Sequence, residues 1–253
     1  GKKYRVYNLV FDSMQDFDCA TSYYDTPEAP ADTVQASQMP SPDACENPRN
    51  AWLYRTASYV SAVFSPLLTP TYCMMVALWA TPLNVLPEGT RLSSAAVVLG
   101  LTCFVPLAVL IALVRLGKIA DTRVRSRRQR YMLYPVAVVC YCIVGMVMGN
   151  AHAPGWLSGF FLGASLATLV AFAINFFWKI SAHATAVGGL FAVLFYIAAA
   201  GLNEYYFMPW LTAGALIAGL TGTARLILGA HTLLQVAAGY ALGFSAVLLL
   251  MWI

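Results

Sequence analysis

The sequence predicts an all-α integral membrane protein, folded as a bundle of about seven transmembrane helices. Of its 253 residues, 60% are hydrophobic and only 10% are charged, whereas a soluble domain is nearer half apolar and a quarter charged. Several apolar runs are long enough to cross a bilayer as helices. These runs lack the alternation of apolar and polar residues that is typical of β-barrel strands, so we expect helices.

Charge divides the chain into two parts. Residues 1–48 contain eight acidic and three basic residues, a net charge of −5. This part is rich in Pro, Ser and Thr and is predicted to be an extended extramembrane arm, because it cannot bury much apolar surface. The arm is a candidate docking segment for a protein partner, which its sequence does not identify. Residues 49–253 contain three acids and twelve bases, a net charge of +9, and are predicted to form a helical membrane domain.

The apolar runs of the second part predict seven spans. The first covers residues 57–81, and Pro66 and Pro70 inside it are expected to kink the helix. Membrane helices tolerate such residues where neighbours satisfy the freed carbonyl groups. The other six predicted spans are residues 92–114, 131–149, 156–178, 184–201, 207–223 and 232–253.

Three polar stretches interrupt the apolar sequence, at residues 115–130, 179–183 and 225–235. Two crossings separate each stretch from the next, so all three are predicted to lie on one face of the membrane. Of the twelve bases after residue 48, eleven fall on this side. The positive-inside rule then places this face in the cytoplasm, and we expect a protein of the bacterial inner (plasma) membrane.

The converging stretches combine bases and two histidines with almost no carboxylate. Such a site suits an anion, and Arg in particular forms bidentate hydrogen bonds to phosphate. A metal site would require carboxylates or closely grouped histidines, so no metal or other cofactor is expected. If residues 223–235 are helical, His231 and Gln235 share one face. Two histidines beside a cationic site favour phosphoryl transfer, in which one attacks phosphorus and the other protonates the leaving oxygen.

The polar stretches resemble the three signatures of the type 2 phosphatidic acid phosphatases, the lipid phosphate phosphatase superfamily. Residues 224–235 read Ala-Arg, five residues, His, three residues, Gln, and the third signature has Ser-Arg at the start and Asp at the end. Residues 180–183, Ile-Ser-Ala-His, resemble the second signature, Pro-Ser-Gly-His. The basic stretch before Tyr134-Pro135 resembles a degraded first signature, Lys, six residues, Arg-Pro. The order and spacing of the three agree over roughly residues 90–250.

The resemblance implies metal-independent hydrolysis of a lipid phosphate or lipid pyrophosphate through a phospho-histidine. His231 is then the nucleophile, and His183 is the general acid for the leaving oxygen. The residues implied to bind phosphate are Arg225, Arg127, Arg128, Ser181 and Lys179. The expected substrate is a phospholipid or polyprenyl phosphate in the bilayer, and no nucleic acid partner is expected.

Gln235 departs from the family, which has Asp at this position. Gln accepts a hydrogen bond and orients the histidine ring, but it supplies no negative charge. An alternative is therefore a non-catalytic protein of the same fold, a lipid-headgroup-binding or structural subunit of a membrane complex. The retained His183, His231 and Arg225 favour an enzyme over this alternative. A channel or transporter is less consistent with the sequence, which shows no inverted repeat.

Overall fold

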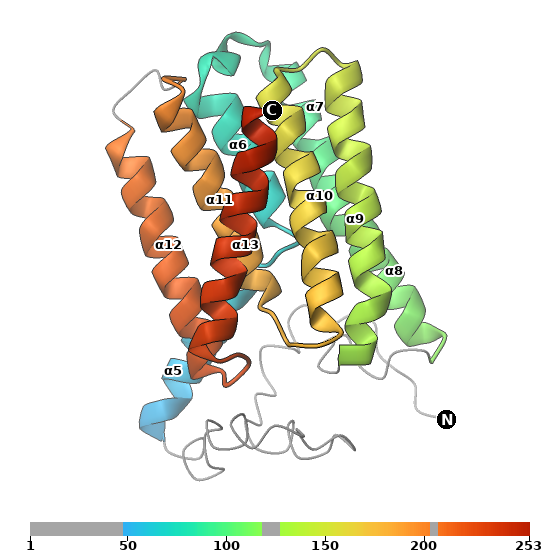
Figure 1. The fold of residues 1–253 in the computed structure, drawn as a ribbon, viewed down its shortest axis with the longest axis vertical. Coiled ribbons are helices and arrows are strands. Elements are labelled where there is room, and N and C mark those ends of the chain that lie inside the picture. Colours follow the sequence, from blue (N-terminus) through green and yellow to red (C-terminus); the bar gives the residue numbers. More distant parts are fainter. Residues whose placement is uncertain (1–47, 118–126, 203–206) are drawn as a thin grey trace.

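A computed structural model of the chain describes residues 48–117, 127–202 and 207–253. The predicted arm, apart from its last residue, and most of the basic stretch 115–130 lie outside these ranges. The elements of the described residues are α5 Pro48–Val63, α6 Thr69–Ala80, η2 Pro82–Val85, α7 Glu88–Leu99, η3 Gly100–Phe104, α8 Val105–Arg115, α9 Arg127–Asn150, α10 Gly155–Asn175, α11 Ala182–Ala199, α12 Met208–Ile227 and α13 Leu233–Trp252. All of these elements are helical, as predicted (Figure 1).

Six helices of the described residues are long and apolar enough to cross a membrane. The longest combines α7, η3 and α8 into one segment of 28 residues. The others are Met132–Asn150 within α9 and the whole of α10, α11, α12 and α13. The protein is therefore an all-α membrane protein, with six candidate spans where the sequence predicts about seven.

The span predicted at residues 57–81 is two helices rather than one kinked helix. Helix α5 ends at Val63, and α6 begins at Thr69 after a turn. The physical reason is that Pro66 and Pro70 lie four residues apart and neither has an N–H group, so two rungs of the helical ladder are missing within one turn. Neither half reaches the length of a span alone, which accounts for the difference between six and seven.

Side chains from neighbouring helices satisfy the carbonyl groups that this break exposes. The Tyr141 hydroxyl of α9 donates to the Pro66 carbonyl oxygen at 3.0 Å. The Thr102 hydroxyl of η3 donates to the Leu67 carbonyl oxygen at 3.4 Å. Carbonyl groups without such partners are costly inside a membrane protein, so these bonds fix the break at its place in the bundle.

The segment η3 is a π-helical turn, and a proline explains it. Pro106, in the first turn of α8, has no N–H to bond the carbonyl group four residues before it. Just before it, the Val105 N–H bonds instead to the Gly100 carbonyl oxygen, five residues earlier. Such widened turns are frequent at functional sites, and this one lies beside the α5–α6 break through the bond from Thr102.

Helices α10, α11 and α13 pack closely through glycine. A Cβ atom on Gly239 would lie 2.8 Å from the Ser181 carbonyl oxygen, and one on Gly163 would lie 2.7 Å from the Val247 Cα. Real Cβ atoms do not approach other atoms so closely, so only glycine permits these distances. Small residues allow membrane helices to approach backbone to backbone, and here they join three helices into one tight unit.

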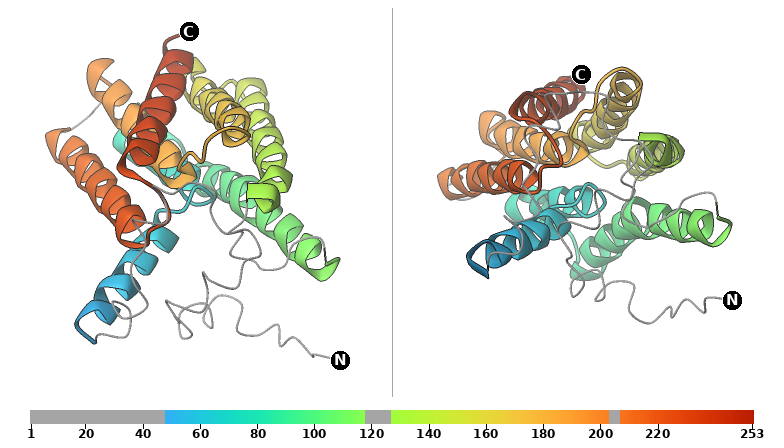
Figure 2. Two further views of the ribbon diagram at one scale, coloured as in Figure 1. Left: turned by 60° about the horizontal axis from the view of Figure 1, so that its bottom comes forward. Right: turned by 90° about the horizontal axis from the view of Figure 1, so that it is seen from below.

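The connections α10–α11 and α12–α13 lie at the same end of the bundle as the first turn of α9 and the last turn of α8 (Figure 1). The C-terminus and the α9–α10 turn lie at the opposite end. Helix α5 packs against α12, and both further views place it at the outer edge of the bundle (Figure 2). This arrangement brings α5 to the end where the predicted catalytic stretches meet.

Candidate active site

The stretch that contains His231 is a helix start, not the middle of one helix. Helix α12 ends at Ile227, and Gly229 adopts a φ of 59°, which reverses the chain before α13. Thr232 is the N-cap of α13: its hydroxyl accepts from the Gln235 N–H at 3.4 Å, and Gln235 Oε1 accepts from the Thr232 N–H at 3.2 Å. This reciprocal pair is a capping box, and it fixes the Gln235 side chain.

The capping box also determines which nitrogen of His231 carries a proton. A backbone N–H can only donate, so the Gln235 atom facing Thr232 is its oxygen. His231 Nδ1 lies 3.1 Å from that same oxygen and therefore donates to it. A neutral ring protonated at Nδ1 carries its in-plane lone pair on Nε2. Both side chains are 5% exposed, so the ring is held in one orientation inside the protein.

Ser61, near the end of α5, contacts the other two groups of the site. His183 Nε2 donates to the Ser61 carbonyl oxygen at 3.1 Å. The Arg225 guanidinium donates to the Ser61 hydroxyl at 2.7 Å. His183 belongs to the first turn of α11, and Arg225 to the last turn of α12. One residue thus links three helices at this end of the bundle.

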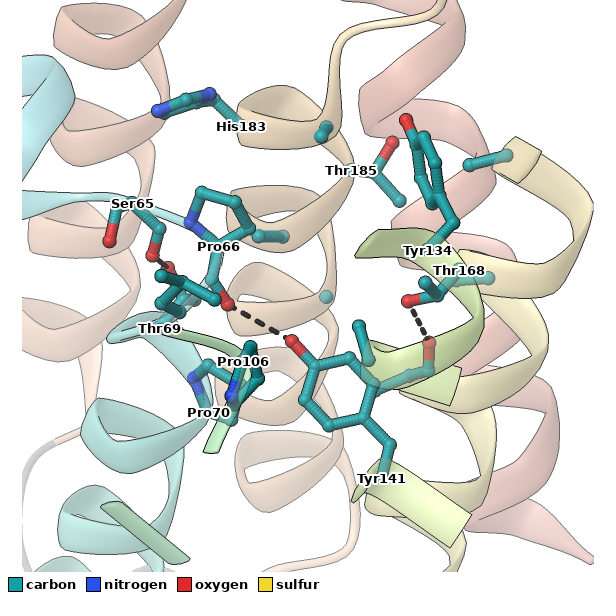
Figure 3. Close-up of a pocket in the computed structure, with 18 of the residues that line it drawn as sticks. Ser65, Pro66, Thr69, Pro70, Pro106, Tyr134, Tyr141, Thr168, His183 and Thr185 are labelled. Atoms are coloured by element: carbon teal, nitrogen blue, oxygen red, sulfur yellow. Dashed lines mark hydrogen bonds between the residues drawn. The ribbon is translucent and has the colours of Figure 1, made fainter. Parts of the chain in front are cut away.

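A cavity of about 410 Å³ lies between the helices, and His183, Arg225 and His231 all contribute to its lining. Figure 3 shows His183 on one side, with Thr185 and Tyr134 across from it. The predicted nucleophile, the predicted general acid and one predicted phosphate-binding residue therefore share a single cavity. Among its lining residues none is acidic.

The chemistry of this arrangement suits a tetrahedral anion. A guanidinium and two imidazoles contribute to the lining, and arginine binds phosphate oxygens through several N–H groups. In the described ranges, no three His, Cys, Asp or Glu side chains gather as a protein metal site would require. The hydrogen bond at Nδ1 leaves the lone pair of His231 on Nε2, which makes Nε2 a nucleophilic nitrogen.

The remaining predicted site residues lie elsewhere. Ser181 is fully buried as the N-cap of α11, where its hydroxyl accepts from the Ala184 N–H at 3.3 Å. Lys179 is half-buried in the α10–α11 connection and is not among the residues that line the cavity. Arg127 and Arg128 begin α9 at this end of the bundle, and their side chains lie outside the described residues.

Sequence reasoning did not find Ser61, because a single serine in an apolar run has no distinguishing spacing. The last predicted span begins at Thr232, where the structure places the N-cap of α13, but the capping box itself was not predicted. The signal for that start is present, since Thr232-Leu-Leu-Gln235 fits the capping-box pattern of Ser or Thr followed three residues later by Glu or Gln. The role of Gln235 in capping was therefore visible in the sequence, whereas the role of Ser61 was not.

Comparisons of the chain with protein-family models, curated proteins and solved structures found no match. The motifs of the sequence and the geometry of the cavity are therefore what indicates a function.

Proposed function

We propose that the protein is a membrane-embedded, metal-independent phosphatase that hydrolyses a lipid phosphate or lipid pyrophosphate through a phospho-histidine. One observation carries the proposal: His231, His183 and Arg225 come from three separate helix ends and line the same cavity. The resemblance of their sequence stretches to the lipid phosphate phosphatase signatures gives each of them a role, and the hydrogen bonds around His231 are compatible with its role.

In the first step, the electron pair of His231 Nε2 attacks phosphorus and the bond to the lipid oxygen breaks. His183 gives a proton to that oxygen, so the lipid leaves as an alcohol, or as a monophosphate if the substrate is a pyrophosphate. Arg225 binds the equatorial phosphate oxygens, on which charge accumulates in the transition state. Positive charge develops on His231, and its Nδ1–H remains bonded to Gln235 Oε1.

In the second step, water attacks the phospho-histidine and releases inorganic phosphate. His183, now neutral, takes a proton from the attacking water, and His231 regains its electron pair. Gln235 orients the ring but does not neutralise the positive charge that develops on it, because a carboxamide is uncharged. We therefore expect a slower enzyme than one with a carboxylate at this position.

The proposal also includes an arrangement of the protein in the membrane. The broken pair α5–α6 forms a seventh crossing, the site faces the cytoplasm, and the membrane is the inner membrane of a bacterium. The eleven bases that the sequence places on the side of the three polar stretches support this orientation. The substrate reaches the cavity from the bilayer, as a phospholipid or polyprenyl phosphate would.

The decisive experiment measures phosphate release from a panel of lipid phosphates and pyrophosphates, in the presence of a metal chelator. The unmodified protein is compared with His231→Ala and His183→Ala. We expect release that survives the chelator and falls by at least about 1,000-fold in His231→Ala, since the nucleophile is lost. Equal release by His231→Ala and the unmodified protein would contradict the proposal.

His152 provides a matched control because it is the one histidine of the sequence that has no role in the proposed site. It lies in the exposed turn between α9 and α10, at the opposite end of the bundle, with a φ of 55°. Asn tolerates this backbone conformation well, so His152→Asn removes an imidazole without strain. We expect unchanged phosphate release in this variant.

A second candidate is a non-catalytic subunit with the same fold. The neutral Gln235 beside His231 favours it, and so do the bonds from His183 and Arg225 to Ser61, which suit a purely structural junction. If the folded protein releases no phosphate from any lipid of the panel, this candidate replaces the phosphatase.

A further inference from the structure

The cavity extends far beyond the His183, Arg225 and His231 end. Along α10 its lining runs from Ala171 back to Phe160, eleven residues, or roughly 16 Å at the rise of an α-helix. It also reaches Val247, which lies in the C-terminal third of α13. The site is therefore the polar end of an elongated chamber inside the bundle rather than a shallow pocket at its surface.

Small residues create the room for this chamber. They come from three different helices, α9, α10 and α11, and are Ala137, Ala164, Ala167, Ala171, Ala182, Ala186 and Gly189. Three prolines close the opposite wall, where the α5–α6 break and the first turn of α8 lie: Pro66, Pro70 and Pro106 (Figure 3). The irregular helices thus complete a space that straight helices with larger side chains would fill.

Three hydroxyl groups in the chamber walls are bonded to backbone carbonyl groups. Thr69 donates to the Ser65 carbonyl oxygen at 2.8 Å, and Thr168 donates to that of Ala164 at 2.7 Å. Tyr141 donates to Pro66 at 3.0 Å. Because these protons are in use, the walls of this part of the chamber offer few donors to a ligand, and an apolar occupant meets no loss of hydrogen bonds.

We propose that this chamber binds the hydrocarbon chain of the lipid phosphate, so that the chain lies inside the bundle while the phosphate meets Arg225 and the two histidines. The proposal rests on the proposed function for the identity of the anionic group. The apolar chamber itself does not depend on the proposed function. Its volume of about 410 Å³ is within the range of pockets that enclose small ligands. A cationic end followed by an apolar interior selects an amphiphile with an anionic head.

The test compares two alkyl phosphates with the same leaving group chemistry, dodecyl phosphate and ethyl phosphate. Both are assayed in lipid nanodiscs, because an alkyl detergent would compete for the chamber. Ala164→Phe places a large side chain in the chamber, and Ala137→Phe does so from another helix. The matched control is Ala173→Phe, which changes an exposed residue of the same helix α10 as Ala164.

We expect Ala164→Phe and Ala137→Phe to lower kcat/KM for dodecyl phosphate by at least about tenfold, because the added ring occupies space that the chain needs. Ethyl phosphate hydrolysis remains within about twofold, which also shows that the variants fold. Ala173→Phe leaves both substrates unchanged. Equal effects of Ala164→Phe on both substrates, or none on either, would overturn the proposal.

A second measurement separates this proposal from the proposed function. A dodecyl phosphate with a photoreactive diazirine at the end of its chain is bound to His231→Ala and irradiated, and the labelled residues are identified by mass spectrometry. We expect adducts on chamber residues such as Cys73, Phe160 or Val247. Adducts confined to outward-facing residues such as Leu162 and Leu169 would refute chain binding, whether or not the protein is a phosphatase.

Discussion

Helices α10, α11 and α13 differ from helices α5 to α8 in backbone packing and in the regularity of their helices. In the first group, glycines such as Gly163 and Gly239 allow the helices to approach until a single Cβ atom would collide. In the second group, prolines interrupt the helices, and side-chain hydroxyls bond to the exposed carbonyl groups. The first group is regular and tight, and the second is irregular and encloses space.

The two groups contribute differently to the site. His231 and Gln235 are fixed at the start of α13, and His183 at the start of α11, both in the tight group. Ser61 reaches the site from the irregular group. The two histidines are therefore held by the closely packed helices, whereas the broken helices form one wall of the cavity, opposite the small residues of α9, α10 and α11.

The largest expected effect is on the free energy of unfolding. Replacing a glycine with alanine should lower it much more in the tight group than in the irregular group. In Gly243→Ala the new methyl group would lie 2.8 Å from the Thr185 carbonyl carbon, so α11 and α13 must separate. We expect a loss of about 3 kcal/mol or more in the free energy of unfolding. The measurement is the thermal unfolding midpoint, followed by size-exclusion chromatography of heated samples.

Gly100→Ala is the matched variant in the irregular group, since nothing lies within 4 Å of its added methyl group. It is expected to change the free energy of unfolding by no more than about 1 kcal/mol. If both variants lower the unfolding midpoint equally, the distinction between a tight group and an irregular group fails.

The next effect concerns the side chain that orients the proposed nucleophile. Gln235→Ala removes the acceptor for His231 Nδ1, and we expect kcat to fall about 10- to 100-fold. Gln235→Glu keeps an oxygen at the same reach and adds a negative charge beside the ring, so kcat should rise. Steady-state phosphate release measures both.

Thr232→Ala serves as the control for this pair. It removes the hydroxyl that caps α13 but leaves Gln235 in place, so it should cost about 1 kcal/mol of stability with little change in kcat. If Thr232→Ala lowers kcat as much as Gln235→Ala does, the effect belongs to the helix start rather than to His231.

A smaller effect is expected at the α5–α6 break. Tyr141→Phe leaves the Pro66 carbonyl oxygen without its hydroxyl donor, which should cost about 1–3 kcal/mol in the free energy of unfolding. Tyr59→Phe changes an exposed tyrosine of α5 and should change it by less than about 0.5 kcal/mol. Equal unfolding midpoints for the two variants would mean that the hydroxyl of Tyr141 does not stabilise the break.

The smallest effect is expected at Ser61. Ser61→Ala removes the acceptor for the Arg225 guanidinium but keeps the carbonyl group that binds His183. We expect KM to rise about two- to tenfold while kcat stays unchanged, because Arg225 loses one anchor. Ser58→Ala, one turn earlier on α5, is the control, and a fall in kcat in Ser61→Ala would contradict a role limited to Arg225.

Much of the helical architecture could be predicted from the sequence, because apolar runs of span length have few other stable forms in a bilayer. His183, Arg225 and His231 line one cavity, whereas the common membrane face of their stretches stays a prediction from the crossing count. Their chemistry stays a prediction, since motif spacing identifies residue types and neighbours but measures no reaction.

Other features depend on contacts that spacing does not encode. Pro66 and Pro70 predict a disturbed helix, but whether it kinks or breaks depends on donors such as Tyr141, 75 residues away. The link from Ser61 to Arg225 joins residues 164 positions apart. Such long-range pairs follow from helix packing, which a single sequence does not determine.

During synthesis, the α5–α6 break is made before the residues that donate hydrogen bonds to it. Ribosomes deliver the chain from its N-terminus, so the Pro66 and Leu67 carbonyl groups enter the membrane before Thr102 and Tyr141 have been synthesised. The hydrogen bond from Thr102 needs the segment from α7 to α8, and the one from Tyr141 cannot form until α9 has been inserted. Until then water or the insertion machinery must solvate the break, and variants that slow the insertion of α9 should prolong the exposure of this segment to proteolysis.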